Sequence, residues 1–467
     1  MLNIDIYNKL ILNKFKNLKF LEQNILEKII IAYLISTVSF ILIYNLINYD
    51  VLYGYDAEAH LSYVNYVAMY LPQEFKLPLK NDTYEFFNPP IAYIFPALIQ
   101  VLCRNLSTSV NLVEYCQPVY GKATQVFQTI LYLTSIFIFM KIANILQNKK
   151  NFFNLNVFLT ISLLTVNYRT INMIRGEPYI LFFMSLLILY LIKVYKSDFQ
   201  LSLKNLLIFS SCVGLLGLSR QWGLLLLPSL ALIIFFVQDK KRKNYFIFML
   251  IVFLIFIIIV SPFYFHLFQN YGSVTSFNME PSKFDFRNQP LSFYIPISGS
   301  LSALFDEPIR GNFDNQLLPI LYSDLWGDYW GYFSFTSKSL DTGRNQMLIG
   351  NYLGRVNLLS IFPTVLLIVA FSKLGKYKEN QLIYKYFKYT IYFTFFGYLW
   401  FLIKYPSIPS GDTIKSTYML QLFNLLGLSL AIYLDKLKQN KKSIYKVYLV
   451  ILTIVFSHNL SAMLSHF

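Results

Sequence analysis

The sequence predicts an all-helical polytopic membrane protein, and three observations lead to this fold class. Hydrophobic residues make up 56% of the 467 residues, charged residues only 14%, and the mean hydropathy is +0.48. A soluble protein of this length needs more polar side chains than that to cover its surface. The apolar residues form long runs, and lysines gather in the short stretches between them. We therefore expect one integral membrane domain over residues 1–467.

The apolar runs predict about eleven transmembrane helices, because about 20 apolar residues cross a hydrocarbon core of about 30 Å. The runs are Ile29–Ile47, Tyr120–Leu146, Phe153–Thr170, Tyr179–Val194, Leu206–Leu218, Gly223–Val237, Tyr245–Phe265, Tyr352–Ser372, Tyr386–Ile403, Thr417–Leu434 and Tyr445–Met463. The lysine-rich start, from Lys9 to Lys28, has no small-residue cleavage site. It is therefore expected to lead into an uncleaved anchor.

The basic connectors set the expected orientation. Lysines favour cytoplasmic loops, so connectors such as Lys149–Lys150 and Lys240–Lys243 are expected in the cytoplasm, together with the N-terminus. Two long loops then face outside, Asn48–Val119 and Leu267–Asn351. The second loop holds eight acidic against five basic residues, a bias expected of an outer loop, and its many aromatic residues predict an ordered cap. The protein is thus expected in the plasma (inner) membrane.

The apolar stretch Pro89–Cys103 is not counted as a span. Counting it would place every later lysine run outside, against the charge rule. We expect a re-entrant or interfacial helix, opened by Pro89 and Pro90 and packed in the outer leaflet.

Charge and cysteines exclude other classes. The net charge of +16 comes from lysines between apolar runs, without a basic groove interleaved with stacking aromatics, so no nucleic-acid partner is expected. Three cysteines form neither a zinc pattern nor a CxxC motif. Only Cys103 and Cys116 are expected to share one compartment; we expect two free thiols there, with a disulfide between them as the alternative.

Polar residues gather at the expected outer boundary of the membrane. The hexamer YDAEAH, just past the first span, brings Asp56, Glu58 and His60, and ionisable groups are costly to strand in lipid. The others lie near span ends: Asn88, Arg169, Arg175, Glu177, Arg220, Gln221, Lys404, Asp412 and Lys415. This set suits a reaction in which a base deprotonates a nucleophile while fixed cations hold an anionic leaving group.

Each candidate also has a structural explanation. Arg169 and Lys404 are expected to extend to lipid headgroups, and Asp56 has the alternative of a solvated loop acid or helix cap. Arg220 lies in the short turn SRQWG, where a bulky cation is a poor choice for mere chain reversal. Lys415 is expected about one turn inside a helix start, where backbone amides favour an anion. Both cations are therefore candidates for phosphate contact.

No cofactor or metal ligand is firmly predicted. Asp56 and His60 would share a helical face whereas Glu58 would not, and no second histidine lies nearby. A divalent metal stays open as an alternative, because hard cations accept Asp and Glu oxygens. Trp326 and Trp330 are expected to be packing or interfacial-belt residues rather than sugar platforms.

The order of these motifs resembles the GT-C glycosyltransferases, polytopic enzymes that use polyprenyl-phosphate sugars. The acidic motif after the first span, the later NPPIAY element at Asn88 and the GEP at Glu177 carry the resemblance over about the first half of the chain. The external cation Arg220 and a late basic residue, Lys415, before a tyrosine add to it. Protein O-mannosyltransferases and lipid A aminoarabinose transferases are branches of this superfamily.

The resemblance implies a role for each matched position. Asp56 corresponds to the catalytic acid of the family, with Glu58 as the alternative because the usual adjacent Asp-Glu pair is separated here. Substrate or phosphate contacts are implied for His60, Asn88, Glu177, Arg220 and Lys415. Asn88 stands where the family usually has Lys or His.

The expected function is inverting transfer of a sugar from a polyprenyl-phosphate donor to an acceptor at the outer face of the membrane. The expected partners are that donor, membrane lipids, and a lipid-linked glycan, lipid or protein as acceptor. A flippase or other transporter of lipid-linked glycans is one alternative, although it would need polar residues near the bilayer midplane. An O-antigen-type polymerase or ligase is the other, with its chemistry in the second outer loop.

Overall fold

Helices account for every regular element in the part of the chain that the computed structural model describes. It describes residues 24–48, 50–52, 54–106, 112–296, 298–331, 346–377 and 379–465, so most of the lysine-rich start lies outside it. Within these ranges, seven helices are long and apolar enough to cross a membrane: Ile25–Ile47, Val113–Leu146, Glu177–Lys196, Asp239–Tyr271, Leu348–Leu374, Ser416–Asn440 and Lys442–Met463. An all-helical chain with several such helices supports an integral membrane protein.

The four other predicted spans coincide with helices outside this set. Residues 153–170 form two short helices, α6 (Leu155–Ser162) and α7 (Thr165–Ile171). The remaining elements are α9 (Leu203–Ser219), the series η2 (Gln221–Leu226), α10 (Leu227–Leu232) and η3 (Ile233–Phe236), and α17 (Gln381–Lys404). The count of about eleven spans stays a prediction.

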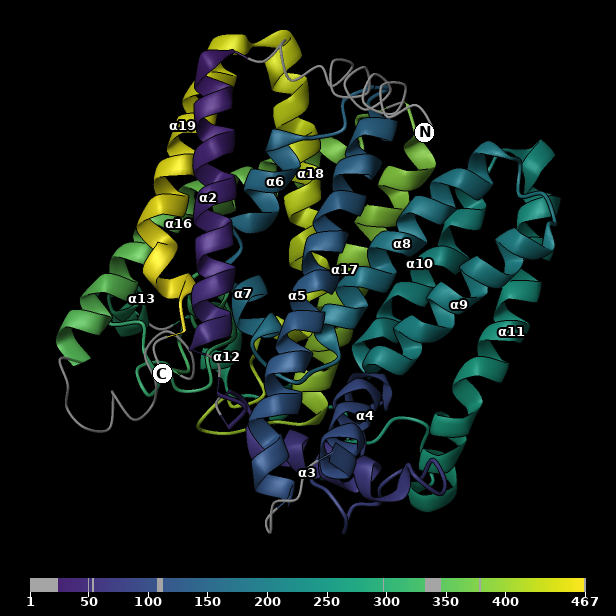
Figure 1. Cartoon of the computed structure of the whole chain (residues 1–467). Coiled ribbons are helices and arrows are strands. Elements are labelled where there is room, and N and C mark those ends of the chain that lie inside the picture. Colours follow the sequence, from purple (N-terminus) through teal and green to yellow (C-terminus); the bar gives the residue numbers. More distant parts are fainter. Residues whose placement is uncertain are drawn as a thin grey trace, which may run out of the picture.

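The long helices lie side by side in one bundle (Figure 1). At one flank α2 (Ile25–Ile47) lies beside α19 (Lys442–His458), and at the other α9 packs against α11 (Asp239–Tyr271). The centre belongs to α18 (Leu420–Asn440): 89% of the apolar stretch of Ser416–Asn440 is buried, against 28% for Asp239–Tyr271. The largely exposed apolar surface of α11 is what a lipid-facing helix presents.

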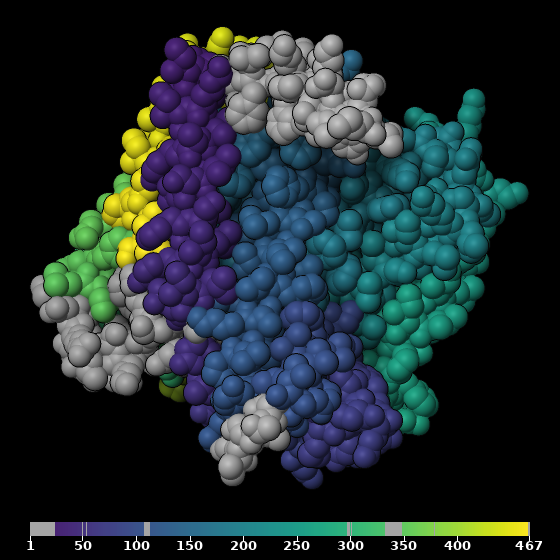
Figure 2. Space-filling view, in the orientation of Figure 1, coloured from purple at the N-terminus to yellow at the C-terminus, as the bar shows by residue number. Residues whose placement is uncertain are grey.

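One end of the bundle collects the short helices of the two predicted outer loops. The first loop supplies α3 (Ala57–Tyr70) and α4 (Ile91–Leu106), and its purple-to-blue surface forms the lower end of the molecule in Figure 2. The second supplies α12 (Leu291–Tyr294), α13 (Ser298–Asp306) and α14 (Leu317–Trp326). The turn between α18 and α19 lies at the opposite end (Figure 1). The helix predicted after the double proline is α4, and its depth in a membrane stays a prediction.

The expectation of free thiols in the first loop is wrong. Cys103 and Cys116 form a disulfide, with their Cα atoms 5.9 Å apart. The reason is geometric: α4 ends at Leu106 and α5 (Leu112–Leu146) begins soon after, so the chain turns back and brings the two helix ends together. Cys212 is buried and free.

Candidate active site

A polar cavity of about 380 Å³ lies between the two predicted outer loops and residues 407–418, in the connection from α17 to α18. Its walls come from segments far apart in the chain. They are Tyr55, Asp56, Tyr84, Glu85, Phe87, Phe277, Asn278, Met279, Arg310, Trp330, Ser407, Asp412, Thr413, Lys415 and Tyr418. The cavity therefore joins the early acidic motif to the late basic one.

Asp56 and Lys415 form an ion pair in this cavity. Asp56 precedes α3 in a left-handed conformation with φ of 56°, which Asp tolerates better than most residues. Its side chain makes no capping hydrogen bond, and Oδ2 lies 3.1 Å from Lys415 Nζ. The helix-cap alternative is therefore excluded, because the carboxylate faces the cavity instead of the helix amides.

Neighbouring cations control the protonation of this pair. Burial by itself would raise the pKa of Asp56, but Lys415 and Arg175 hold it well below its usual range, and His60 adds to this effect only when it is protonated. Burial acts to lower the pKa of Lys415, whereas Tyr418 and Asp56 more than offset it and raise this pKa. Both groups are therefore charged at neutral pH.

The segment that carries Lys415 is fixed by backbone hydrogen bonds. Lys415 N donates to Tyr398 Oη at 2.7 Å, and that hydroxyl donates to Thr413 O at 2.8 Å. Trp330 Nε1 donates to Ile414 O at 3.1 Å. These contacts from α17 and the second predicted outer loop fix the point from which the ammonium group enters the cavity.

A second, fully buried charge cluster lies around Arg220. Its Nε is 3.1 Å from Glu177 Oε1, and its Nη1 is 3.6 Å from Glu85 Oε2. Arg175 Nε is 3.8 Å from the other oxygen of Glu177. Gly176 permits this assembly, because a Cβ there would lie only 1.8 Å from Ser219 O, directly before Arg220.

Tyr418 connects the two charge clusters. The guanidinium carbons of Arg175 and Arg220 each lie 5.7 Å from the centre of its ring, and Lys415 Nζ lies 5.9 Å away. Buried cations are attracted to an aromatic face at this range. Arg175 Nη2 and Arg220 Nη1 have no hydrogen-bond partner among the described residues. Donors of this kind suit a phosphate group.

Glu85, Asn88 and His60 form a hydrogen-bonded layer behind the cavity. Asn88 Nδ2 donates to Glu85 and, at 3.2 Å, to Tyr93 Oη, which lies 2.7 Å from His60 Nδ1. Burial raises the pKa of Glu85 against the effect of Arg220, and Asp56 raises it further. Burial also lowers the pKa of His60, and Arg175 and Arg220 add to this. His60 is therefore neutral and serves this layer.

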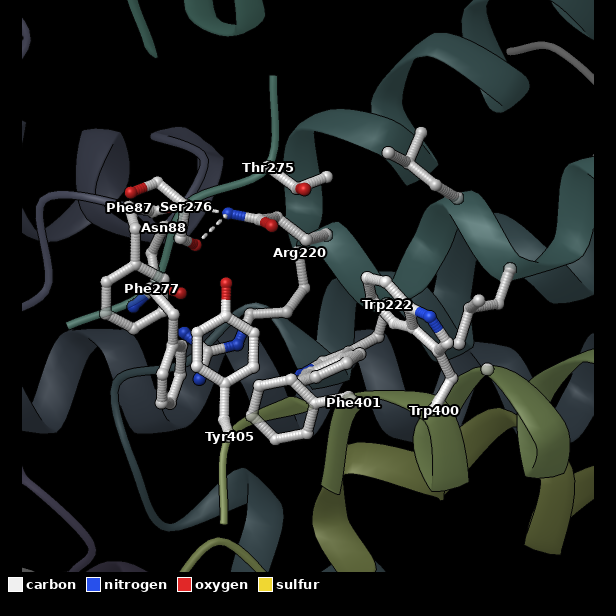
Figure 3. Close-up of a pocket in the computed structure, with 14 residues that line it drawn as sticks. Phe87, Asn88, Arg220, Trp222, Thr275, Ser276, Phe277, Trp400, Phe401 and Tyr405 are labelled. Atoms are coloured by element: carbon white, nitrogen blue, oxygen red, sulfur yellow. Dashed lines mark hydrogen bonds between the residues drawn. The ribbon is translucent and has the colours of Figure 1, made fainter. Parts of the chain in front are cut away.

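An apolar route leads away from Arg220. A cavity of about 170 Å³ has Arg220 in its wall, among the rings of Trp222, Trp400, Phe401 and Tyr405 (Figure 3). It shares Phe87 and Phe277 with the polar cavity. Gln221 Nε2 donates to Phe87 O and Ser276 O at 2.7 and 3.0 Å, the bonds dashed in Figure 3. Phe87 and Phe277 thus form the wall between the two cavities, and Gln221 fixes this wall through the backbone of Phe87 and of Ser276, the residue before Phe277.

A third cavity extends the apolar route along the flank of the bundle. It has a volume of about 620 Å³ and is lined by apolar residues of α9, α10 and α11. Leu224 belongs to its wall and to that of the cavity at Arg220. A ligand with a charged head and a long apolar tail would find matching surroundings along this series.

The structure brings together most of the sequence candidates. Asp56, His60, Asn88, Glu177, Arg220 and Lys415 lie in or directly behind the two cavities, as described above. Glu58 is exposed on α3 and does not line the polar cavity. Among the described residues, no group of three or more His, Cys, Asp and Glu side chains is arranged to hold a metal.

Two structural expectations, one for Arg169 and one for two tryptophans, have different outcomes. Arg169 does not extend to headgroups, which corrects that prediction: it is buried, with Nη1 3.7 Å from Asp324 and 3.8 Å from Asp328. Those carboxylates lie in the second predicted outer loop, and the sequence gives no sign that they pair with an arginine at a helix end. Trp326 and Trp330 are buried packing residues as predicted, although Trp330 also lines the cavity.

Sequence reasoning missed Glu85 and Asp324 and gave Arg175 no role of its own. Glu85 precedes the NPP element by three residues, a spacing that could have indicated a partner for Asn88. Neither a known protein-family model nor a curated protein matches this chain.

Proposed function

We propose that this protein is a GT-C-like glycosyltransferase that transfers a sugar from a polyprenyl-phosphate donor to an acceptor at the outer face of the membrane. One observation carries the proposal: the polar cavity with the Asp56–Lys415 pair adjoins an apolar cavity with Arg220 in its wall. A lipid-linked donor needs this combination, because its tail is apolar, its phosphodiester is anionic and its sugar is polar.

The donor would extend from the apolar cavity to the polar cavity, past the wall that Phe87 and Phe277 form between them. Its tail would follow the apolar cavities along α9, α10 and α11, and its phosphate would contact Arg220 and Lys415, with Arg175 close by. The sugar would then reach the polar cavity near Asp56. The buried guanidinium nitrogens of Arg220 and Arg175 would become hydrogen-bonded by the phosphate oxygens.

The chemical step is a single displacement with inversion. Asp56 accepts the proton of an acceptor hydroxyl as that oxygen bonds to the anomeric carbon. The bond from this carbon to the phosphate oxygen breaks, and the electron pair leaves with the polyprenyl phosphate. The sugar passes through an oxocarbenium-like state, as in glycoside hydrolysis. Cations placed at the leaving phosphate are typically worth about 3 to 4 kcal/mol each.

Lys415 links donor binding to base strength. In the empty site it lowers the pKa of Asp56, which makes the carboxylate a poor proton acceptor. A bound phosphate would share the ammonium group and weaken its hold on Asp56, so the pKa of Asp56 would rise. The base would thus strengthen only once the donor is in place.

The proposed orientation puts the cavity outside the cytoplasm, with about eleven spans and the N-terminus inside. The Cys103–Cys116 disulfide fits an oxidising compartment for the first loop. The lysine-rich turn between α18 and α19 lies at the other end of the bundle, which agrees with the charge rule. Nucleotide sugars are not available outside, so a lipid-linked donor is the consistent choice.

The test is transfer from polyprenyl-phosphate sugars by the purified protein in lipid nanodiscs. Asp56→Asn should lower the rate at least about 100-fold, the usual effect of losing a general base. Asp82→Asn is the matched control, because Asp82 is an exposed carboxylate of the same loop that accepts a hydrogen bond from Leu79 N. Near-normal transfer by Asp56→Asn together with an inactive Glu58→Gln variant would move the base to Glu58.

A further inference from the structure

Asp324, in α14 of the second outer loop, is a buried carboxylate that the proposed reaction does not use. It is 1% exposed, and both of its oxygens are engaged. Oδ1 accepts a hydrogen bond from Tyr55 Oη at 2.8 Å. Oδ2 accepts two, from Ser416 N at 2.7 Å and from Ser416 Oγ at 2.6 Å.

The partners of Asp324 are the immediate chain neighbours of the cavity ion pair. Tyr55 directly precedes Asp56, and Ser416 directly follows Lys415. The carboxylate thus holds the early loop on one oxygen and the late segment on the other. No hydrogen bond joins Asp324 to Asp56 or Lys415 among the described residues, so its influence on them runs through these neighbours.

The charge of Asp324 is balanced from a third segment. Arg169 Nη1 lies 3.7 Å from its Oδ1, and Arg169 also donates to its backbone carbonyl. A buried carboxylate is costly unless it is paired and hydrogen-bonded, and here it has both kinds of partner. A group that is fully engaged in this way can hold two chain segments at a fixed separation.

We infer that Asp324 is a positioning residue that sets the distance between Asp56 and Lys415. This rests on the proposed function only in assigning the pair to sugar transfer; the positioning itself is a statement about geometry. Hydrogen bonds to a charged group are stronger than those between neutral groups, which suits a carboxylate for this task. Without its contacts the early loop could move away, the ion pair would lengthen, and Asp56 would take up protons more readily.

The test reads the protonation of Asp56 without requiring activity. Carbodiimides modify protonated carboxyl groups, so the labelling rate of Asp56 at pH 5, followed by peptide mass spectrometry, reports how readily it is protonated. The groups that act on the protonation of Asp56 are the cations Lys415 and Arg175 and the titratable side chain of His60. Tyr55→Phe removes one hydroxyl and leaves these three groups in place.

We expect Tyr55→Phe to raise the labelling rate of Asp56 about tenfold, in line with the loss of a hydrogen bond to a charged partner. Sugar transfer should also lose turnover with KM for the donor unchanged, because a displaced Asp56 no longer lies where it can accept the proton of the acceptor hydroxyl. Ser416→Ala removes one bond to the other oxygen and should act in the same direction. Tyr322→Phe is the matched control. Tyr322 lies in α14, as Asp324 does, but its hydroxyl donates to Asn357 O at 2.7 Å rather than to Asp324.

Wild-type labelling rates in both Tyr55→Phe and Ser416→Ala would overturn the inference, whatever their activity. An equal rise in Tyr322→Phe would also overturn it, because the effect would then be a general loosening of α14. If the wild-type protein transfers no sugar while the labelling rates differ as expected, the proposed function fails and the positioning role stands.

Discussion

Replacing Lys415 by Gln removes the ammonium group whose Nζ lies 3.1 Å from Asp56 Oδ2. At this separation two unit charges attract by about 1.3 kcal/mol in water and about 5 kcal/mol at an effective dielectric constant of about 20. The Asp56 side chain is 37% exposed and the Lys415 side chain 11%. Because the pair is partly exposed, we take a value between these limits, about 2.7 kcal/mol. This energy corresponds to a shift of about two units in the pKa of Asp56.

The direction of the pKa change follows from the ion pair between Lys415 and Asp56. Lys415 lowers the pKa of Asp56, so its removal raises that pKa and favours the protonated carboxyl. Well above its pKa, the protonated fraction of an acid rises tenfold for each unit of pKa, so carbodiimide labelling of Asp56 at pH 5 should be about 100-fold faster. The acid limb of any residual transfer activity should move up by about two pH units, because protonated Asp56 cannot act as a base.

Peptide mass spectrometry after timed labelling measures this change for Asp56 alone. Lys404→Gln is the control, because Lys404 is the last residue of α17 and its ammonium group lies over the Trp400 ring, 5.0 Å from the ring centre. Labelling of Lys415→Gln at the wild-type rate would refute the reasoning, since it would mean that the ion pair does not govern the protonation of Asp56.

The other predictions concern the phosphate site and the orientation. Arg220→Gln should weaken donor binding strongly, and Arg220→Lys should recover only part of the binding, because lysine lacks the bidentate guanidinium group of arginine. Donor titration measures the affinity of both variants. Effects no larger than that of Lys404→Gln would mean that Arg220 only anchors a helix end. Arg220→Gln should also destabilise the detergent-solubilised protein by about 1 to 3 kcal/mol, because Glu177 loses its 3.1 Å partner in a buried site and keeps only Arg175 at 3.8 Å. Thermal unfolding measures this, and an unchanged midpoint would contradict the burial of the pair. Reporter fusions after Lys243 should read cytoplasmic and those after Asp314 external, and an external signal at Lys243 would reverse the proposed orientation.

Composition and hydropathy were sufficient to predict the helical membrane class, because lipid leaves few other ways to satisfy backbone groups. They did not predict how single spans are built. The run 153–170 reads as one helix, yet it is divided between α6 and α7. Such breaks depend on neighbours that supply hydrogen bonds, and a linear pattern carries no information about those neighbours.

The candidate site was likewise predictable from the sequence only in part. Asp56, Arg220 and Lys415 could be proposed because each charge stands out in an apolar context. Asp324 could not, because its loop contains many polar residues and only the fold brings it to Tyr55 and Ser416. Arg169 was misjudged for the same reason: a cation at a helix end has the same sequence context whether it reaches lipid headgroups or a buried carboxylate.

The separation of the paired charges along the chain has a consequence for biogenesis. Glu177 and Arg220 are 43 positions apart, whereas Asp56 and Lys415 are 359 apart. At about 5 to 20 residues per second, ribosomes need about 20 to 70 seconds to make the chain between the latter two. The ion pair between Glu177 and Arg220 can therefore form within seconds of the synthesis of Arg220, whereas Asp56 can pair only after Lys415 has been made. The nascent protein thus passes through a stage in which Glu177 and Arg220 can already pair while Asp56 still lacks Lys415, and the late arrival of Lys415 completes the charge balance of the cavity.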